Sequence, residues 1–599
     1  MLRRVLLVML SVSLAGPSAV ASGESATFDA LLDDIGRTML ARYPEEATDL
    51  GLSGELGLDD TRLDDHSPAY LAETAQLAQR AFDRLAAVDS DALTPDERIS
   101  LAVTEWYLDD LVTMTAFADH EYALNFITGP HVNLPEFMAD IHPLDDLDDA
   151  GAYVRRLRAA GEQLEQVGHW FGRNEERGNL PTTRGVEIAA WQVGQQVDAP
   201  ESHPLVTDFE ARLARLDLAA EAREDLVQAA RDAVRGSILP AYMELAYALD
   251  GATTRTDERP GVLHHPGGRD YYLAVLRHHL SSPLTPDEVH EIGLAEVERV
   301  RHELDEALMA VGYEVETMGF ARAMEAASRA ASTVPLRSDE DRVELLSATE
   351  AFIADTRSAF TDMFSRLPSA PLEVRRPRPG REGGAGAYYR PPPAMGERPG
   401  IYYLNLAGDF FALDTYATTN YHEAVPGHHF QLALQRGSEA LPLLQRATSF
   451  TGYAEGWALY AERLAYEAGL YEDDQLGNLG RLRMELLRAA RAVADTGIHW
   501  LGWSRDEAIA YLVELGFPPG WAASEVDRYI VWPGQAPAYL IGMLEILRLR
   551  AEAQHALGDD FDVADFHDAV LRHGSVPLDV LPLAVAAYIE SATADVAIP

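Results

Sequence analysis

Apolar residues recur every three or four positions along much of this chain, and this spacing constrains the fold more than any other feature. Segments 72–88, 211–234 and 288–308 show the pattern among Glu, Asp and Arg residues. Such spacing is typical of amphipathic helices that bury one face in a core. Proline and glycine separate these segments and mark the turns between them. We therefore expect a mainly α protein with a large helical body.

The length and one polar stretch suggest that this body is divided into two halves. With 599 residues the chain exceeds the usual size of one compact core. Residues 250–262 are polar and contain glycine and proline, so we expect an N-terminal helical half (22–250) and a C-terminal half (251–599) within one continuous unit.

One region of the C-terminal half departs from the helical pattern. Residues 368–400 are rich in Pro, Gly and Arg, which predicts a long loop. Residues 401–406 are apolar and aromatic, which predicts a strand and therefore a small antiparallel β element. A strand before a metal-binding helix can offer its edge to an extended peptide through main-chain hydrogen bonds.

The N-terminus has the pattern of a secretory signal peptide over residues 1–21. Arg3 and Arg4 precede an apolar run at 5–15, and small residues at 19–21 supply a cleavage site. The run is too short to span a bilayer comfortably, and an uncleaved anchor is the alternative. We expect an exported protein, periplasmic or extracellular, with no stable membrane span after signal cleavage.

Composition excludes several classes of function. The formal net charge is −47 and the basic residues are all arginine, so a nucleic-acid partner is not expected. The chain has no cysteine, which excludes disulfides, thiol catalysis and cysteine-ligated zinc.

Four residues have the chemistry of a catalytic zinc site. His422 and Glu423 are followed by His428, and Glu455 comes 27 residues later. Two imidazoles and one carboxylate suit Zn²⁺, and a catalytic site keeps one position for water. The free Glu423 would then take the proton of that water. The sequence therefore predicts His422, His428 and Glu455 as metal ligands and Glu423 as the general base.

The interval between the two histidines predicts a break in the helix that carries them. We expect a helix over 410–421 that leads into the motif. His422 and His428 are six residues apart, which puts them about 120° out of phase on a regular helix. Pro426 and Gly427 lie between them and can distort the backbone enough to bring His428 to the ion. His429 is the alternative second ligand.

Two longer motifs resemble one protein family. The segments HEAVPGHHFQ (422–431) and YAEGWALYAE (453–462) are similar to the signature of the domain-of-unknown-function 885 family, mostly helical and often exported bacterial proteins. The similarity extends over nearly the whole mature chain, including 129–131, 290–294, 402–405 and 528–536. More distantly, the site resembles those of helical gluzincin peptidases such as angiotensin-converting enzyme and carboxypeptidase Taq.

The resemblance to gluzincins carries further expectations. It implies the same metal ligands and general base, an active site enclosed in a channel, and Tyr529 as the group that stabilises the oxyanion. We also take Tyr403, Asn405, Gln535 and Tyr539, in or beside the shared segments, as candidate substrate-binding residues.

A predicted helix over 480–498 carries a row of arginines and acids. This row is either a solvent-facing stripe or a buried set that orders Glu455 or a substrate carboxylate. We include Arg488, together with His429 and an Asp495–His499 pair four residues apart, as residues that support the ligands from behind.

These features favour an exported zinc-dependent metallopeptidase that hydrolyses short peptides. The alternatives are a zinc hydrolase of a non-peptide amide or ester, with the same site, and a catalytically inactive binding protein. The presence of Glu423 argues against the last alternative, because a structural metal site does not need a general base.

Overall fold

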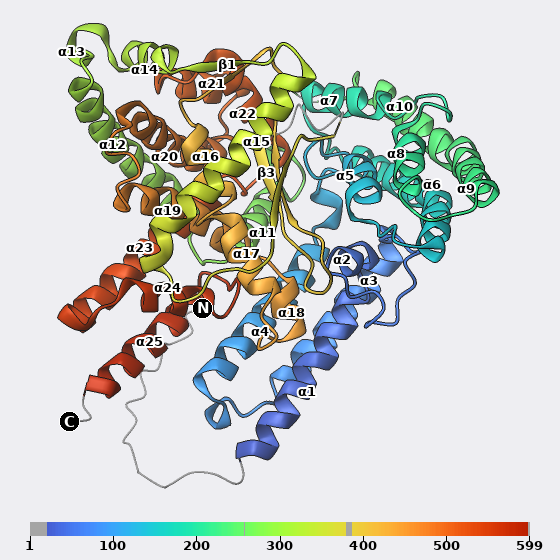
Figure 1. The fold of residues 1–599 in the computed structure, drawn as a ribbon, viewed down its shortest axis with the longest axis horizontal. Coiled ribbons are helices and arrows are strands. Elements are labelled where there is room, and N and C mark those ends of the chain that lie inside the picture. The colour runs from blue at the N-terminus through green and yellow to red at the C-terminus, as the bar shows by residue number, and fades with distance from the viewer. Residues whose placement is uncertain (1–20, 257, 379–385, 597–599) are drawn as a thin grey trace.

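The computed structural model describes residues 21–256, 258–378 and 386–596 (Figure 1). The predicted signal peptide lies outside these residues except for Ala21, where the first helix begins. The fold is mainly α, as the apolar periodicity predicts. Within the described residues, no helix combines the length and the apolar character that crossing a membrane would require.

The first half of the chain forms ten α-helices among the described residues. They are α1 (Ala21–Leu40), α2 (Pro44–Asp49), α3 (Pro68–Leu85), α4 (Pro95–Thr115), α5 (Pro130–Glu136), α6 (Leu147–Glu176), α7 (Thr183–Gly194), α8 (Pro204–Leu213), α9 (Ala220–Ala233) and α10 (Leu239–Ala252). Several begin at a proline that follows a capping residue. At α4, Thr94 accepts from the Glu97 N–H while the Glu97 carboxylate accepts from the Thr94 N–H.

Helices α5–α10 enclose a hydrophobic core of their own. Its buried residues come from positions 123–252, and Tyr153 stacks on Phe209 with ring centroids 4.3 Å apart. These helices gather on one side of the molecule (Figure 1). Helices α1, α3 and α4 instead share a smaller core that includes Leu444 of the second half. The division of the chain at residue 250 stays a prediction.

The second half forms the larger helical body. Its helices are α11 (Gly268–Leu280), α12 (Pro286–Ala310), α13 (Val315–Met318), α14 (Phe320–Ala330), α15 (Asp339–Thr356), α16 (Tyr416–Glu423), α17 (His428–Arg436), α18 (Leu443–Ala447), α19 (Thr451–Glu467), α20 (Gln475–Thr496), α21 (Arg505–Glu514), α22 (Pro519–Val531), α23 (Ala538–Leu557), α24 (Val563–Leu571) and α25 (Leu581–Val596). One large core joins most of them. Helix α19 packs along α23, and α12 packs along α20.

Two glycines explain how closely α19 and α23 approach. A Cβ on Gly456 would lie 2.4 Å from the backbone of Gly542, and a Cβ on Gly542 would lie 1.8 Å from the Gly452 carbonyl oxygen. Larger side chains at these positions would push the two helices apart. This close contact fixes the position of α19, which carries Glu455.

Two of the predicted helical segments need correction. The segment 211–234 is not one helix, because α8 ends at Leu213 and α9 begins at Ala220. The helix predicted over 410–421 begins only at Tyr416, because residues Phe410–Ala412 form strand β5 instead. Strand β5 pairs antiparallel with β1 (Thr333–Pro335), which no local sequence pattern marked.

The predicted β element is present and lies between helices α5–α10 and the helical body of the second half (Figure 1). The predicted strand is β4 (Gly400–Leu404), and the region predicted as a long loop contains two further strands, β2 (Leu372–Arg375) and β3 (Ala387–Arg390). Strand β4 pairs antiparallel with β3 and parallel with β2. It is therefore the central strand, and it does not offer the free edge that we expected.

Candidate metal centre

The backbone breaks between the two histidines, as the interval predicts. Helix α16 ends at Glu423 and α17 begins at His428, with non-helical dihedrals at Ala424 (φ −108°, ψ −102°) and Gly427 (φ −78°, ψ −132°). A Cβ on Gly427 would lie 1.9 Å from the His422 carbonyl oxygen, so only glycine fits there. The break reorients the chain so that His428 faces His422.

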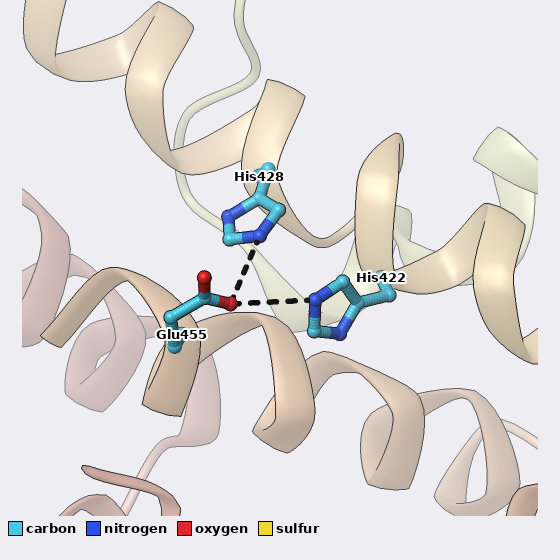
Figure 2. Close-up of side chains that lie close together, drawn as sticks. All are labelled: His422, His428 and Glu455. Atoms are coloured by element: carbon cyan, nitrogen blue, oxygen red, sulfur yellow. Dashed lines mark ion pairs between the residues drawn. The ribbon is translucent and has the colours of Figure 1, made fainter. Parts of the chain in front are cut away.

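Three side chains from two regions of the chain converge at this break (Figure 2). Glu455, on α19, places one carboxylate oxygen 3.6 Å from His422 Nε2 and 3.4 Å from His428 Nε2. The three ligand atoms lie within 4.8 Å of one another, and no other group of this kind occurs in the described part of the chain. The structure thus brings together the three residues predicted as metal ligands.

The donor set fits zinc. Ligand atoms placed about 2.0–2.1 Å from one ion in a tetrahedron lie roughly 3.3 Å apart, close to the two distances found here. The Glu455 oxygen nearest both histidines is buried and has no hydrogen-bond partner among the described residues. An oxygen left in this state is costly unless a cation or a donor satisfies it.

The electrostatics of the site also favour a cation. Burial alone would raise the pKa of Glu455, but His422 and His428 hold it well below its ordinary value. Burial would lower the pKa of His422, yet Glu455, Glu462 and Glu423 raise it to about 10. The cluster of carboxylates around His422 thus stabilises positive charge at this position.

Glu423 lines the same cavity without joining the ligand group. Its carboxyl is buried, and one of its oxygens has no hydrogen-bond partner among the described residues. Burial raises its pKa, and the neighbouring His422 and His428 oppose this rise. A carboxylate with a raised pKa, beside the candidate ion but outside the ligand set, is suited to accept a proton.

Sequence reasoning missed Glu462, which fixes the orientation of His422. The Glu462 carboxylate accepts a hydrogen bond from His422 Nδ1 at 2.8 Å, so Nε2 is left to face the metal position. Arg488 donates to the same carboxylate oxygen at 3.1 Å. Glu462 lies seven residues after Glu455, two turns along the same face of α19, and this spacing was the available signal.

The arginine row on α20 is buried, so the solvent-facing interpretation is wrong. Arg488 and Arg491 are 5% and 6% exposed. Arg488 supports a ligand through Glu462, as expected for a residue behind the ligands.

The expected Asp495–His499 pair does not form. Asp495 accepts from the Tyr272 hydroxyl at 2.6 Å and from the Gly534 N–H. His499 donates from Nε2 to the Tyr529 carbonyl at 2.9 Å. Both residues are buried, and their hydrogen bonds connect the end of α20 to α11 and α22. They do not pair with each other because the helix becomes irregular at Gly497, before His499.

His429 points away from the ligands. Its Nδ1 lies 2.9 Å from the Tyr389 hydroxyl on β3, and burial lowers its pKa to about 4. His429 therefore anchors β3 to α17.

The structure does not place Tyr529 at the cavity, which corrects its assignment as the oxyanion-stabilising group. Tyr529 is fully buried and its hydroxyl donates to Glu525 at 2.8 Å. Tyr539, at the start of α23, lines the cavity instead, and its ring stacks on His422 with centroids 6.2 Å apart. Tyr529 lies on the buried face of α22, and Arg528 is the residue of that helix that lines the part of the cavity beside His422, His428 and Glu455.

Three of the four candidate substrate-binding residues are not among the residues that line the cavity. The Tyr403 hydroxyl donates to Asp140, and the Asn405 side chain accepts from the Ala407 N–H. Gln535 is buried and donates to the Tyr539 hydroxyl at 3.3 Å, so it acts on the cavity through Tyr539.

The cavity has two neighbouring lobes, which share His422, Glu423, Arg528 and Tyr539 among their lining residues. One lobe, of about 390 Å³, is lined by all four predicted metal-site residues and by Tyr388 and Tyr389 of β3. The other, of about 430 Å³, extends from Glu423 and Tyr539 toward α20 and α22. Both volumes fall in the range of small-ligand sites, roughly 300–1,000 Å³.

Comparison with known proteins gives one family and two similar structures. The model of the family described as "Bacterial protein of unknown function (DUF885)" matches residues 44–585. No curated protein matches the chain. A crystal structure of a candidate lipoprotein from Colwellia psychrerythraea has a TM-score of 0.88 and 30% identity, over 95% of this chain and 100% of that chain.

The second structure is a candidate lipoprotein of unknown function from Shewanella oneidensis. It has a TM-score of 0.65 and 19% identity, over 94% of this chain and 99% of that chain. At this identity the likeness concerns the fold alone.

Proposed function

The chain belongs to the DUF885 family of bacterial proteins, and we propose that it is an exported zinc-dependent metallopeptidase that hydrolyses short peptides. The observation that carries the proposal is the convergence of His422, His428 and Glu455 beside Glu423, which is not part of the ligand group. Export rests on the predicted signal peptide, and both similar structures come from candidate lipoproteins.

His422, His428 and Glu455 would hold the ion, with Glu462 fixing the first of them. Zinc bound there supplies Lewis-acid chemistry, which activates a water molecule and polarises the carbonyl under attack. The cavity beside these residues, lined by Glu423 and Tyr539, provides space for that carbonyl.

Glu423 acts as the general base and then as a general acid. It takes a proton from the attacking water as the new C–O bond forms, and it delivers that proton to the peptide nitrogen as the C–N bond breaks. Burial raises the pKa of Glu423, which favours the protonated form that the second step requires.

Tyr539 is positioned to stabilise the negative oxygen that develops on the carbonyl. Arg528 donates to its hydroxyl at 3.0 Å and Gln535 donates at 3.3 Å, so both contacts use the oxygen as the acceptor. The phenolic hydrogen is therefore free to point into the cavity and to donate to the oxyanion.

The test is a screen of short peptide mixtures by mass spectrometry, with the zinc-loaded mature protein and its Glu423→Gln variant. We expect new cleavage products with the parent protein and none with the variant. Cleavage by both proteins would point to a contaminant. Cleavage of amide or ester substrates but of no peptide would replace the peptidase by the non-peptide hydrolase.

A further inference from the structure

The second lobe of the cavity carries more arginine than carboxylate side chains, in an otherwise acidic protein. Four arginines and three carboxylates line this lobe, which we call the arginine lobe: Arg483, Arg488, Arg491 and Arg528, with Asp414, Glu423 and Glu525. The net charge of the chain is −47, so the overall field repels anions. The excess of arginine over carboxylate in this lobe therefore provides local attraction for a negative group.

Three of these arginines have acidic partners. Arg483 pairs with Asp414. Arg491 binds Glu525 through two nitrogens, at 3.0 and 2.8 Å. Arg488 donates a hydrogen bond from Nη2 to Glu462, while its Nε is buried with no hydrogen-bond partner among the described residues.

Arg528 has only neutral partners among the described residues. It donates to Gln535 at 2.9 Å and to the Tyr539 hydroxyl at 3.0 Å, and it forms no ion pair with a carboxylate of the described chain. It lines both lobes of the cavity. Burial would lower the pKa of Arg528 and nearby Glu525 helps to raise it, but the Glu525 carboxylate is paired with Arg491. A ligand carboxylate would therefore supply the direct ion pair that Arg528 lacks.

The arginine lobe lies on one defined side of the reacting bond. Glu423 and His422 line both lobes, whereas His428 and Glu455 line only the other. Because Glu423 delivers the proton to the leaving nitrogen, that nitrogen must lie next to Glu423, and the leaving portion of the peptide must start there. The arginine lobe therefore receives the part of the substrate on the C-terminal side of the cleaved bond.

Resting on the proposed function, we propose that the arginine lobe binds the free C-terminal carboxylate of the substrate, with Arg528 as its principal partner. The enzyme then releases a residue or short peptide from the C-terminal end. Arginine suits this role because its planar guanidinium pairs with a carboxylate through two parallel hydrogen bonds. A lobe of about 430 Å³ suits a small leaving portion.

The experiment measures binding without turnover. The zinc-loaded Glu423→Gln variant is titrated by calorimetry with an N-acetylated tripeptide, either as the free acid or as its C-terminal amide. We expect the acid to bind at least tenfold more tightly than the amide. Equal affinities, or no measurable binding of either probe at millimolar concentration, would overturn the carboxylate site.

A second substitution, added to the Glu423→Gln variant, shows which residue causes the preference for the free acid over the amide. Arg528→Gln should bring the ratio of the two affinities close to one, and Arg528→Lys should keep part of it. Arg548→Gln is the matched control, because Arg548 lies on α23, is half exposed and lines neither lobe. A preference that survives Arg528→Gln in a folded, zinc-binding protein would assign the recognition elsewhere.

Turnover separates this inference from the proposed function. With the parent enzyme, the free acid should be cleaved and the amide should be a poor substrate. If the acid binds selectively but no peptide is cleaved, the carboxylate site stands and the peptidase proposal fails. If acid and amide are cleaved equally, the peptidase stands and the carboxylate site fails.

Discussion

The Glu462 carboxylate lies 2.8 Å from His422 Nδ1 and connects the metal centre to Arg488 on α20. A carboxylate in this position sets the tautomer of the imidazole and makes Nε2 a better ligand. The orientation of His422 therefore depends on Glu462, which lies outside the candidate ligand group.

Glu462→Gln should weaken zinc binding by roughly 10- to 100-fold, the usual cost of losing such a partner. The affinity can be measured by competition with a chromophoric chelator. Glu467→Gln is the control, because Glu467 lies on the same helix but pairs with Arg550 away from the ligands. Equal affinity in the Glu462→Gln variant and the parent would show that His422 is oriented by packing alone.

His428→Ala should abolish tight zinc binding, whereas His429→Ala should retain it. His428 Nε2 faces Glu455, while the His429 ring contacts the Tyr389 hydroxyl. Elemental analysis after dialysis distinguishes the two variants. Loss of zinc from His429→Ala, with retention by His428→Ala, would transfer the ligand role to His429.

Glu423→Gln should keep the zinc and lower turnover by about 10²–10⁴-fold, because glutamine cannot accept the proton of the water. The measurement pairs zinc content with kcat on a peptide found in the screen. If this variant lost its metal, Glu423 would have to be a ligand, and if it kept full turnover, another group would have to be the base.

Tyr539→Phe should lower kcat by about 10²–10³-fold with little change in zinc content, as expected when one oxyanion donor is removed. Tyr529→Phe is the comparison, because its hydroxyl donates to Glu525 and is absent from the cavity. We expect Tyr529→Phe to cost about 1–3 kcal/mol of stability and to leave kcat nearly unchanged. The opposite pattern of kcat values would restore Tyr529 as the oxyanion-stabilising group.

His499 should contribute to a loss of stability in acid. Burial lowers its pKa from the ordinary 6.5 to about 4 in the folded protein. Between these values the unfolded chain binds a proton that the folded chain does not, so the stabilisation is complete above pH 6.5 and is lost as the pH falls toward 4. The full effect is roughly 3 kcal/mol.

The acid effect is measured by urea unfolding of the parent and of His499→Gln between pH 4 and pH 7. The variant should be less stable at pH 7, because the Val262 N–H loses its acceptor on Nδ1. Its free energy of unfolding should nevertheless fall less between pH 6.5 and pH 4. Parallel pH profiles for the two proteins would contradict the role of His499.

The sequence by itself determined the local features of the site. His422 and His428 can face one ion only if the helix breaks between them, because residues six apart lie on different sides of a regular helix. Pro426 and Gly427, which lie between them, allow that break. The residue types alone predicted zinc. Glu455 could be predicted as the third ligand because it lies in the second recognisable motif, at 453–462. The apolar spacing likewise predicted α3 and α12.

Only the tertiary structure decided which side chains meet around that site. Tyr529 and Tyr539 are both plausible from sequence, and the packing of α22 and α23 decides that Tyr539 reaches the cavity. Strand β4 became a central strand because β2 and β3 pair with it from within a region that reads locally as a loop. The pairing of Glu462 with Arg488 and the place of Arg528 at the cavity also depend on this packing. Contacts between distant segments depend on how whole helices and strands pack, and no local spacing contains that information.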